Sequence, residues 1–396
     1  MIFVRRAAIV AVLSLAPAFV NASDMLRPEI GKPLQAAQDL LKHQKYREAL
    51  AQVDAADAVA GQTPYERFII GRMRGAAALG AGDPDLAARA FTAVFATGQL
   101  SKDEMMKASE AVSIAYYRNK QYTKVPGWIH NYDQYGGTDP AVDQLLTQAD
   151  YLGANYADAA RELRLRLDAK ANAGQKPAEE ELQLLSNCAV RQKDEGTYQL
   201  ALEQLLSYYP KKEYWLAAIA GVQRQAGFSE RLRLDVYRLK RATATLAEAA
   251  DYVEMAEMSL QAGFPAEAKQ VLVQGYESRI LGIGSEAARQ QRLRILAERQ
   301  AVTDRIEGVH PADADAKVNS GYALVLADGV NAGITLMQEG IAQGGLKHPD
   351  EARIHLGEAL LAAGRAMEAA KAFAAVQGSG AKGLAKLWGI QANRKV

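Results

Sequence analysis

Small residues recur in this chain at a spacing that brings them together between consecutive helices. In the segment ARIHLGEALLAAGRAMEAAKAFAAV, Gly357 belongs to one helical stretch and Ala369 to the next, with a turn at Gly364 between them. Phe373 follows Ala369 by four residues and therefore shares its face. The two small residues let the helices approach closely, and Phe373 fills the gap beneath them. The pattern predicts a pair of amphipathic helices joined by a tight turn.

The same pattern recurs upstream with loops of variable length. The second small position of five successive copies falls at residues 49, 87, 125, 159 and 201, which are 38, 38, 34 and 42 residues apart. Irregular spacing is typical of divergent repeats. The clear copies are Gly75 with Ala87 and Phe91, Ala256 with Ala268 and Leu272, Gly321 with Gly333 and Met337, and Ala37 with Ala49 and Val53. The weaker copies are Ser113 with Val125 and Ile129, Thr147 with Ala159 and Leu163, and Ala189 with Ala201 and Leu205.

This signature resembles that of the tetratricopeptide repeat (TPR) family, whose unit is a helix pair of about 34 residues. The resemblance covers most of residues 33–378. It implies an all-α fold, a right-handed superhelical solenoid of antiparallel helix pairs that ends in a C-terminal capping helix. Every signature residue is a packing residue, so the pattern specifies architecture and carries no chemistry.

The N-terminus has the three parts of a secretory signal peptide. Arg5 and Arg6 precede an apolar run from Ala7 to Val20, and Val20-Asn21-Ala22 fits a small-x-small cleavage site. The run is too short for a spanning helix, which needs roughly 20 apolar residues. We therefore expect residues 1–22 to be a signal peptide cleaved after Ala22, and the mature chain to be periplasmic. An uncleaved anchor is the alternative.

Two polar stretches interrupt the helical pattern, one at residues 168–178 (DAKANAGQKPA) and one at residues 302–315. The first predicts a linker over residues 169–178, between an N-terminal array at residues 23–168 and a C-terminal array at residues 179–396. The last amphipathic stretch, residues 383–392, contains Trp388. Trp388 either covers the last apolar face of the solenoid or docks a partner.

No arrangement of residues in the sequence indicates catalysis. Catalytic and nucleotide-binding motifs such as GxSxG, HExxH and the Walker loop are absent. His348 and His355 are two helical turns apart, but Pro349 lies between them, so His348 should precede the helix and a metal site is not expected. The single cysteine, Cys188, rules out an intramolecular disulfide, and its apolar neighbours favour a buried thiol over a redox-active or dimerising one. We expect no enzyme activity and no cofactor. The net charge of +1, without a basic stripe, also disfavours a nucleic-acid partner.

Aromatic residues are concentrated between Tyr116 and Tyr135, although only 7% of the whole chain is aromatic. Packing between repeats explains such a cluster, and so does a binding surface, because Tyr, Trp and Arg dominate binding hot spots. In the TPR family the first helix of each pair lines a concave groove, which is suited to a protein or peptide partner. The repeat phase places the following residues there: Glu110, Ile114, Tyr117, Arg118, Arg72, Leu79, Glu257 and Leu260.

Three segments are similar to the periplasmic TPR proteins that accompany TonB-type energy-coupling systems in Gram-negative bacteria. They are YRNKQYTKVPGWIHNY, DYVEMAEMSLQAGFPAEAKQVLVQGYESRILG and AFAAVQGSGAKGLAKLWGIQA. The resemblance implies a scaffold that helps outer-membrane transport. An adaptor for outer-membrane assembly or polysaccharide secretion is the alternative, and a peptidoglycan-acting enzyme is a remote one.

Overall fold

The computed structural model describes residues 26–303 and 312–394, and these residues form only helices, turns and loops. The expected signal peptide and its cleavage site lie outside the described residues. The helices before residue 175 are α1 (Pro28–Lys42), α2 (Tyr46–Asp57), α3 (Pro64–Ala81), α4 (Pro84–Ala96), α5 (Lys102–Arg118), η3 (Tyr122–Lys124), α6 (Val125–Gln134), α7 (Pro140–Leu152) and α8 (Tyr156–Asn172). The later helices are α9 (Glu179–Gln192), α10 (Glu195–Tyr208), α11 (Lys212–Arg224), η4 (Glu230–Leu232), α12 (Arg233–Ala242), α13 (Ala249–Gln261), α14 (Pro265–Glu277), α15 (Ala287–Thr303), α16 (Ala314–Leu326), α17 (Val330–Gln343), α18 (Pro349–Ala362), α19 (Ala366–Ala374) and α20 (Ser379–Asn393).

The chain divides into two compact units. The first comprises the residues up to Gly174 together with Cys188–Lys193, and the second comprises Gln175–Asn187 and the residues from Asp194 onward. Helix α8 continues to Asn172, so the non-helical stretch before α9 is shorter than the linker expected at residues 169–178. None of the described helices is both long and apolar enough to cross a lipid bilayer.

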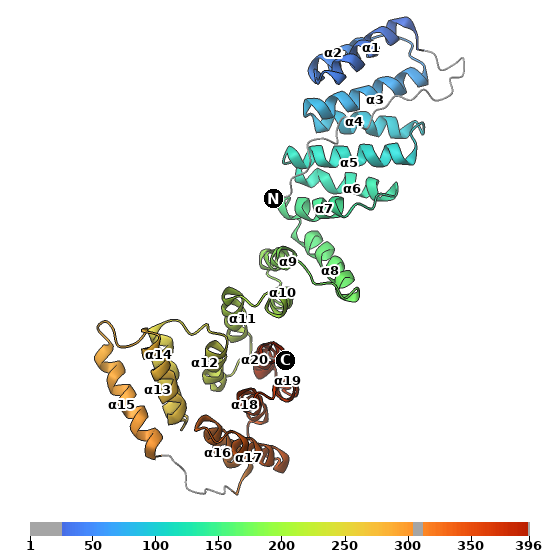
Figure 1. Ribbon diagram of the computed structural model, residues 1–396. Helices are drawn as coiled ribbons and strands as arrows, with labels where there is room; N and C mark the ends of the chain where they lie inside the picture. The colour runs from blue at the N-terminus through green and yellow to red at the C-terminus, as the bar shows by residue number, and fades with distance from the viewer. Residues whose placement is uncertain (1–25, 304–311, 395–396) are drawn as a thin grey trace. The chain divides into compact units, whose positions relative to one another are not determined.

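In the first unit, consecutive helices pack as pairs: α1 with α2, α3 with α4, α5 with α6, and α7 with α8 (Figure 1). The first helix of each pair also contacts the first helix of the next, so that α1, α3, α5 and α7 are joined in sequence. Helices α3 and α5 each begin with a capping box, formed by Thr63 with Glu66 and by Ser101 with Glu104. The expected all-α solenoid of helix pairs is confirmed.

The small residues of the repeat signature lie at the contacts within the pairs. A Cβ atom on Gly75 would come within 2.7 Å of the Phe91 ring, and one on Gly357 within 2.4 Å of the Phe373 ring. These distances are too short for any larger side chain without movement of the ring. Each glycine therefore makes room for the aromatic side chain that the sequence pattern predicted to fill the gap.

The second unit contains further pairs, α13 with α14, α16 with α17, and α18 with α19, and it closes on itself through its last helix. Helix α20 packs on α19, where Trp388 stacks on Phe373 with 5.8 Å between ring centroids. The same helix contacts α10 and α11, and Lys386 forms an ion pair with Glu203 at 2.6 Å. The capping helix thus covers the last repeat and also joins it to the beginning of this unit.

The backbones of α16 and α17 also approach each other closely, and this contact generates a prediction about Gly333. A Cβ atom at Gly333 would lie 2.3 Å from the carbonyl oxygen of Gly321, a backbone atom that cannot rotate away. Replacing glycine with alanine inside a helix normally stabilises by about 1 kcal/mol. We expect Gly333→Ala instead to destabilise the second unit by roughly 1–3 kcal/mol, because the two helices must separate.

The measurement is urea denaturation combined with hydrogen exchange in α16 and α17. Gly389→Ala in α20 is the matched control, because no described atom outside its own helical turn lies within 4 Å of the added Cβ, and it should stabilise slightly. Equal effects of the two substitutions would contradict the close-packing argument.

Candidate functional site

The predicted binding residues of α5 lie on one side of that helix and differ in exposure. Glu110, Ile114 and Tyr117 are half-buried, whereas Arg118 at the C-terminal end of the helix is exposed. The Tyr117 hydroxyl donates a hydrogen bond of 3.0 Å to Oε1 of Gln148 on α7. Burial raises the pKa of Glu110, and the charge of Asp139 adds to this effect. The side chains of α5 and α7 therefore form one continuous, partly polar surface.

The remaining predicted residues have different environments. Arg72 on α3 forms an ion pair with Glu104 on α5 at 2.7 Å, which joins two first helices in the same way as Tyr117 and Gln148 do. Leu79 is only 8% exposed and lies in the hydrophobic core, so its expected place on the binding surface is wrong and its role is packing. Glu257 and Leu260 are half-buried and belong to the second unit, where Glu257 pairs with Arg289 at 2.9 Å.

Most of the aromatic cluster between Tyr116 and Tyr135 packs inside the first unit. Tyr116 and Tyr132 are buried in its core, and Trp128 packs edge-on against Phe95 with 6.0 Å between ring centroids. The Tyr116 hydroxyl donates to Asp85 at 3.0 Å, and burial together with this bond raises the pKa of Tyr116 to about 12. Packing therefore accounts for these rings.

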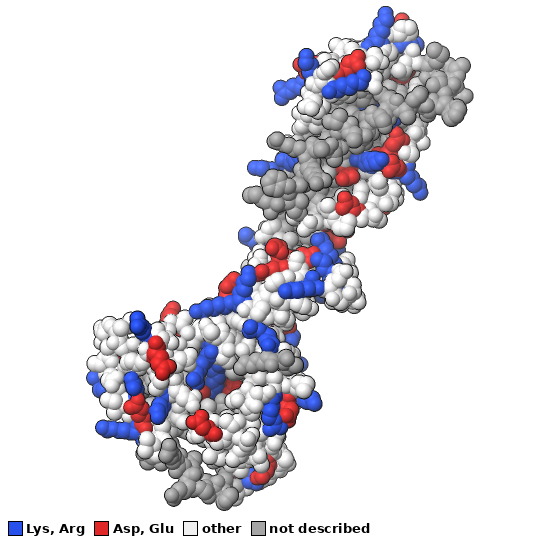
Figure 2. Space-filling model, in the orientation of Figure 1, with Lys and Arg blue, Asp and Glu red and all other residues white. Residues whose placement is uncertain are grey.

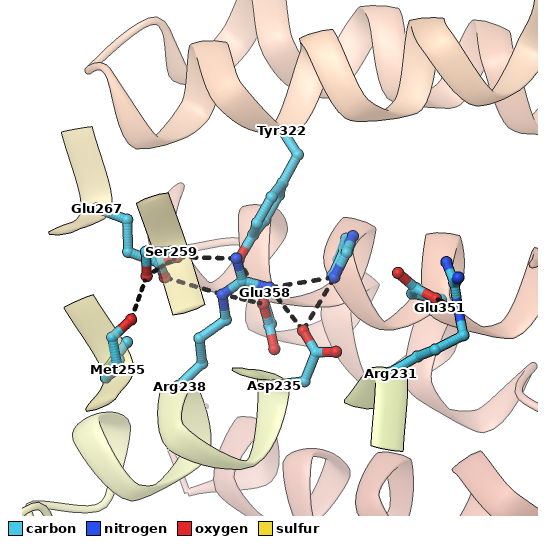
Figure 3. Close-up of polar contacts among 10 residues, drawn as sticks. Arg231, Asp235, Arg238, Met255, Ser259, Glu267, Tyr322, Glu351 and Glu358 are labelled. Carbon is cyan, nitrogen blue, oxygen red and sulfur yellow. Dashed lines mark hydrogen bonds and ion pairs between the residues drawn. The ribbon is translucent and has the colours of Figure 1, made fainter. Parts of the chain in front are cut away.

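The second unit contains a cluster of buried charged side chains that the sequence analysis did not identify. Arg238 on α12 is 5% exposed, and its guanidinium donates two hydrogen bonds of 2.8 Å to the carboxylate of Glu267 on α14 (Figure 3). It also donates to Asp235, one turn earlier on α12, at 2.7 Å. Ser259 on α13 donates to the same Glu267 carboxylate at 3.0 Å. The Arg238–Glu267 pair thus connects α12, α13 and α14.

The cluster extends to two further helices through rings and a third carboxyl group. His355 on α18 lies 2.9 Å from Asp235 and stacks on Tyr322 of α16, with 4.5 Å between ring centroids. The guanidinium of Arg238 lies over the Tyr322 ring, 4.7 Å from its centroid. Tyr322 in turn donates its hydroxyl proton to Oε2 of Glu358, also on α18. Every member of the cluster is buried.

The two carboxyl groups at the ends of the cluster have pKa values shifted in opposite directions. Burial raises the pKa of Glu358 well above its usual range, and the neighbouring charge of Asp235 adds to this shift. Burial alone would also raise the pKa of Asp235, but His355 and Arg238 outweigh it and lower the pKa. The surroundings of Asp235 therefore favour its charged form, and those of Glu358 favour its neutral acid form.

The sequence does carry a signal for this cluster. In helix α18, the apolar residues Ala352, Ile354, Gly357 and Leu360 span more than half of the helix circumference, so only a narrow face is left for solvent. His355 lies outside this apolar arc and is buried all the same. His348 precedes α18 as predicted, because the helix begins at Pro349.

Two other candidate sites can be assessed in the described part of the chain. No group of three His, Cys, Asp or Glu side chains in it is placed to hold a metal ion. Cys188 is fully buried, and burial raises the pKa of its thiol to about 11. The raised pKa disfavours the thiolate form that redox chemistry uses.

Comparisons with known proteins give little information about this chain. No family model matches it, and no curated protein gives a significant match. Among solved structures, the TPR domain of P58(IPK) is 13% identical, with 92% of this chain and 98% of that chain covered and a TM-score of 0.22. Yeast Tom70 is 10% identical, with 92% and 95% covered and a TM-score of 0.20. Scores this low do not define the fold, which the packing of the helix pairs shows directly.

The buried cluster generates a prediction about stability. Arg238→Ala leaves Asp235 and Glu267 buried without their cation, and breaking a buried pair in this way costs roughly 3–5 kcal/mol. Arg233→Ala on the same helix is the matched control, because Arg233 pairs with Glu254 at the surface, where such pairs are worth under about 1 kcal/mol. Urea denaturation of both variants measures the difference. A loss in Arg238→Ala as small as the loss in the control would show that the cluster does not hold the helices together.

Proposed function

We propose that this chain is a periplasmic TPR-type scaffold that binds a protein or peptide partner along the first helices of its first unit. The observation that supports this proposal most is the contact of α1, α3, α5 and α7 with one another in sequence. Each repeat adds one helix to the same surface, so the surface extends with the number of repeats. An extended surface of this kind suits an extended peptide or a partner helix.

The side chains on this surface have the composition of a recognition site. We define the first-helix surface by Arg72, Glu110, Ile114, Tyr117 and Gln148. It combines two charges, an aliphatic side chain and an aromatic ring, and none of these five side chains is fully buried. The Tyr117–Gln148 and Arg72–Glu104 contacts hold side chains from neighbouring helices in place before a partner binds. Such preorganisation reduces the entropy lost on binding.

The surface also has an apolar end. Leu152, the last residue of α7, is 48% exposed, and Tyr151 beside it is half-buried against Tyr156. An exposed leucine offers a contact for an apolar side chain of a peptide, because burying both removes apolar area from water. The partner that fits is therefore a segment with both polar and apolar side chains.

The proposed cellular role is to assist a TonB-type outer-membrane transport system. Its support is the similarity of the three segments noted above, together with the signal-peptide pattern at the N-terminus. In this role the first-helix surface binds one protein component of the system and holds it near the others.

Export to the periplasm gives a direct prediction. When the full-length chain is expressed in a Gram-negative host, we expect it in the periplasmic fraction with Ser23 as its first residue. Cell fractionation and N-terminal sequencing measure both. A variant that starts at Ser23 after an initiator methionine is the control and should stay in the cytoplasm. Recovery of the full-length chain in the membrane fraction with Met1 retained would contradict cleavage.

Partner capture gives a second prediction. We expect the mature chain to retain protein components of a TonB-type system from an envelope extract, and the double variant Tyr117→Ala/Arg118→Ala to lose them. Arg89→Ala/Thr92→Ala is the matched control, because both of its residues are exposed on the second helix α4 and it should retain the same partners.

Quantitative mass spectrometry of the captured proteins distinguishes the outcomes, with thermal unfolding as a check that each variant is folded. Equal capture by both double variants would place the binding surface elsewhere. Retention of outer-membrane assembly or polysaccharide-export proteins instead would overturn the TonB-type assignment while leaving the scaffold in place.

A further inference from the structure

Helix α15 of the second unit is a first helix that lacks a second one among the described helices. It contacts α14 and α13 as α5 contacts α4 and α3, which is the position of the first helix of a new repeat. In the other pairs the first helix is covered by the helix that follows it, as α5 is by α6 and α16 by α17. Helix α16 follows α15 in the described part of the chain but pairs with α17 instead. Figure 1 shows α15 at the edge of this unit, beside α13 and α14.

The side of α15 that points away from α13 and α14 carries exposed apolar side chains. Ala297 is fully buried and marks the side of the helix that faces the unit. On the opposite side, Ala288, Ile295 and Val302 are seven residues apart and therefore share one face. Ile295 is 39% exposed, Val302 is 70% exposed, and Leu296 beside Ile295 is 45% exposed. A helix that packed on this side would remove all of this apolar area from water.

The same side of α15 is basic. The helix contains four arginines and one acidic residue, Glu298. Arg292 precedes Ile295 by three residues and Leu296 by four, so it lies next to both on the helix surface. It is exposed and has no ion-pair or hydrogen-bond partner in the described part of the chain. The space-filling view shows uncharged surface broken by basic and acidic side chains along this edge of the unit (Figure 2).

We propose that the outer face of α15, formed by Ala288, Arg292, Ile295, Leu296 and Val302, binds an amphipathic helix of another protein that has acidic residues beside its apolar stripe. The partner helix takes the place that the second helix takes in the other pairs. Its apolar side chains cover Ile295 and Leu296, and one of its carboxylates pairs with Arg292. The seven-residue spacing matches the seam along which two helices pack side by side. This face is separate from the first-helix surface and lies in the other unit, so it goes beyond the proposed scaffold function.

Charge and its distribution favour an acidic helix over two other occupants. A second copy of this chain would bring the arginines of two α15 helices together, and like charges at an interface oppose binding. A helix that lies on an anionic lipid surface has its basic and apolar residues on separate faces. On α15 the unpaired Arg292 lies among the apolar side chains, where a neighbouring helix can place a carboxylate.

Two synthetic helical peptides test the proposal directly. The first has about three heptads, with leucine at positions a and d and glutamate at e and g, and the repulsion between the glutamates opposes pairing of the peptide with itself. The second has the same leucines and replaces each glutamate with lysine. We expect the mature chain to bind the glutamate peptide about tenfold more tightly than the lysine peptide, because only the former complements Arg292. Fluorescence anisotropy of the labelled peptides measures both affinities.

A matched pair of variants tests the apolar contact. Ile295→Ser/Leu296→Ser should weaken binding of the glutamate peptide about tenfold, because less apolar area is buried. Leu200→Ser/Leu216→Ser is the control and should leave binding unchanged. Its residues lie on α10 and α11 of the same unit and are 39% and 41% exposed, so the two double variants remove similar apolar area. Thermal unfolding checks that both are folded.

A second pair of variants tests the charge. Arg292→Glu should reverse the preference, so that the lysine peptide binds more tightly than the glutamate peptide. Arg224→Glu changes an exposed arginine of α11 in the same unit and should keep the preference for the glutamate peptide. An unchanged preference in Arg292→Glu, or no binding of the glutamate peptide up to about 0.1 mM of the chain, which covers micromolar affinities, would overturn the proposal.

Two further measurements identify the other occupants. Sedimentation velocity detects dimerisation of the mature chain, and a dimer that Ile295→Ser/Leu296→Ser abolishes would assign the face to a second copy. Sedimentation with phosphatidylglycerol vesicles that the same variant loses would assign it to a lipid surface. Either result contradicts a helical partner. The peptide measurements do not involve the first-helix surface, so this proposal and the scaffold proposal can fail separately.

Discussion

The second unit depends on the burial of one guanidinium. Taking a charge out of water costs several kcal/mol, and only close opposite charges and hydrogen bonds offset that cost. Arg238 meets this requirement because Glu267 and Asp235 both contact it and Tyr322 stacks against it. These partners come from different helices, so the helices must be placed correctly for the charge to be tolerated. The interaction therefore selects one arrangement of α12, α14 and α16 over others that would bury a similar apolar area.

Closure of the second unit makes such a buried cluster possible. In an open array each repeat touches only its neighbours, and polar residues between repeats stay near solvent. Here α20 contacts both α19 and the early helices α10 and α11, and Gln391 donates to the carbonyl oxygen of Ala242 at 3.0 Å. Residues more than a hundred positions apart thereby enclose a common interior. His355 and Asp235, which are 120 residues apart, meet inside it.

The sequence predicted the helix pairs because their determinants are local. Gly357 and Phe373 are sixteen residues apart, and a single turn between two helices brings them together. The buried cluster depends on contacts between residues that are 117 and 120 positions apart in the sequence. A repeat pattern of a few dozen residues gives no information on contacts between residues so far apart. Leu79 shows the same limit on a smaller scale. The repeat phase placed it on the first-helix surface, but packing against the neighbouring pair buries it.

The polar side chains of the first-helix surface and those inside the second unit are satisfied to different degrees. On the first-helix surface, Arg72 and Tyr117 already have partners, so a protein that binds there gains from fixed side chains and the exclusion of water. In the second unit, Trp388 and Glu358 each keep a buried polar atom without a hydrogen-bond partner among the described residues. A native core seldom retains such atoms, since each lowers stability. The satisfied charge cluster around Arg238 and the packing of α20 must therefore offset this loss.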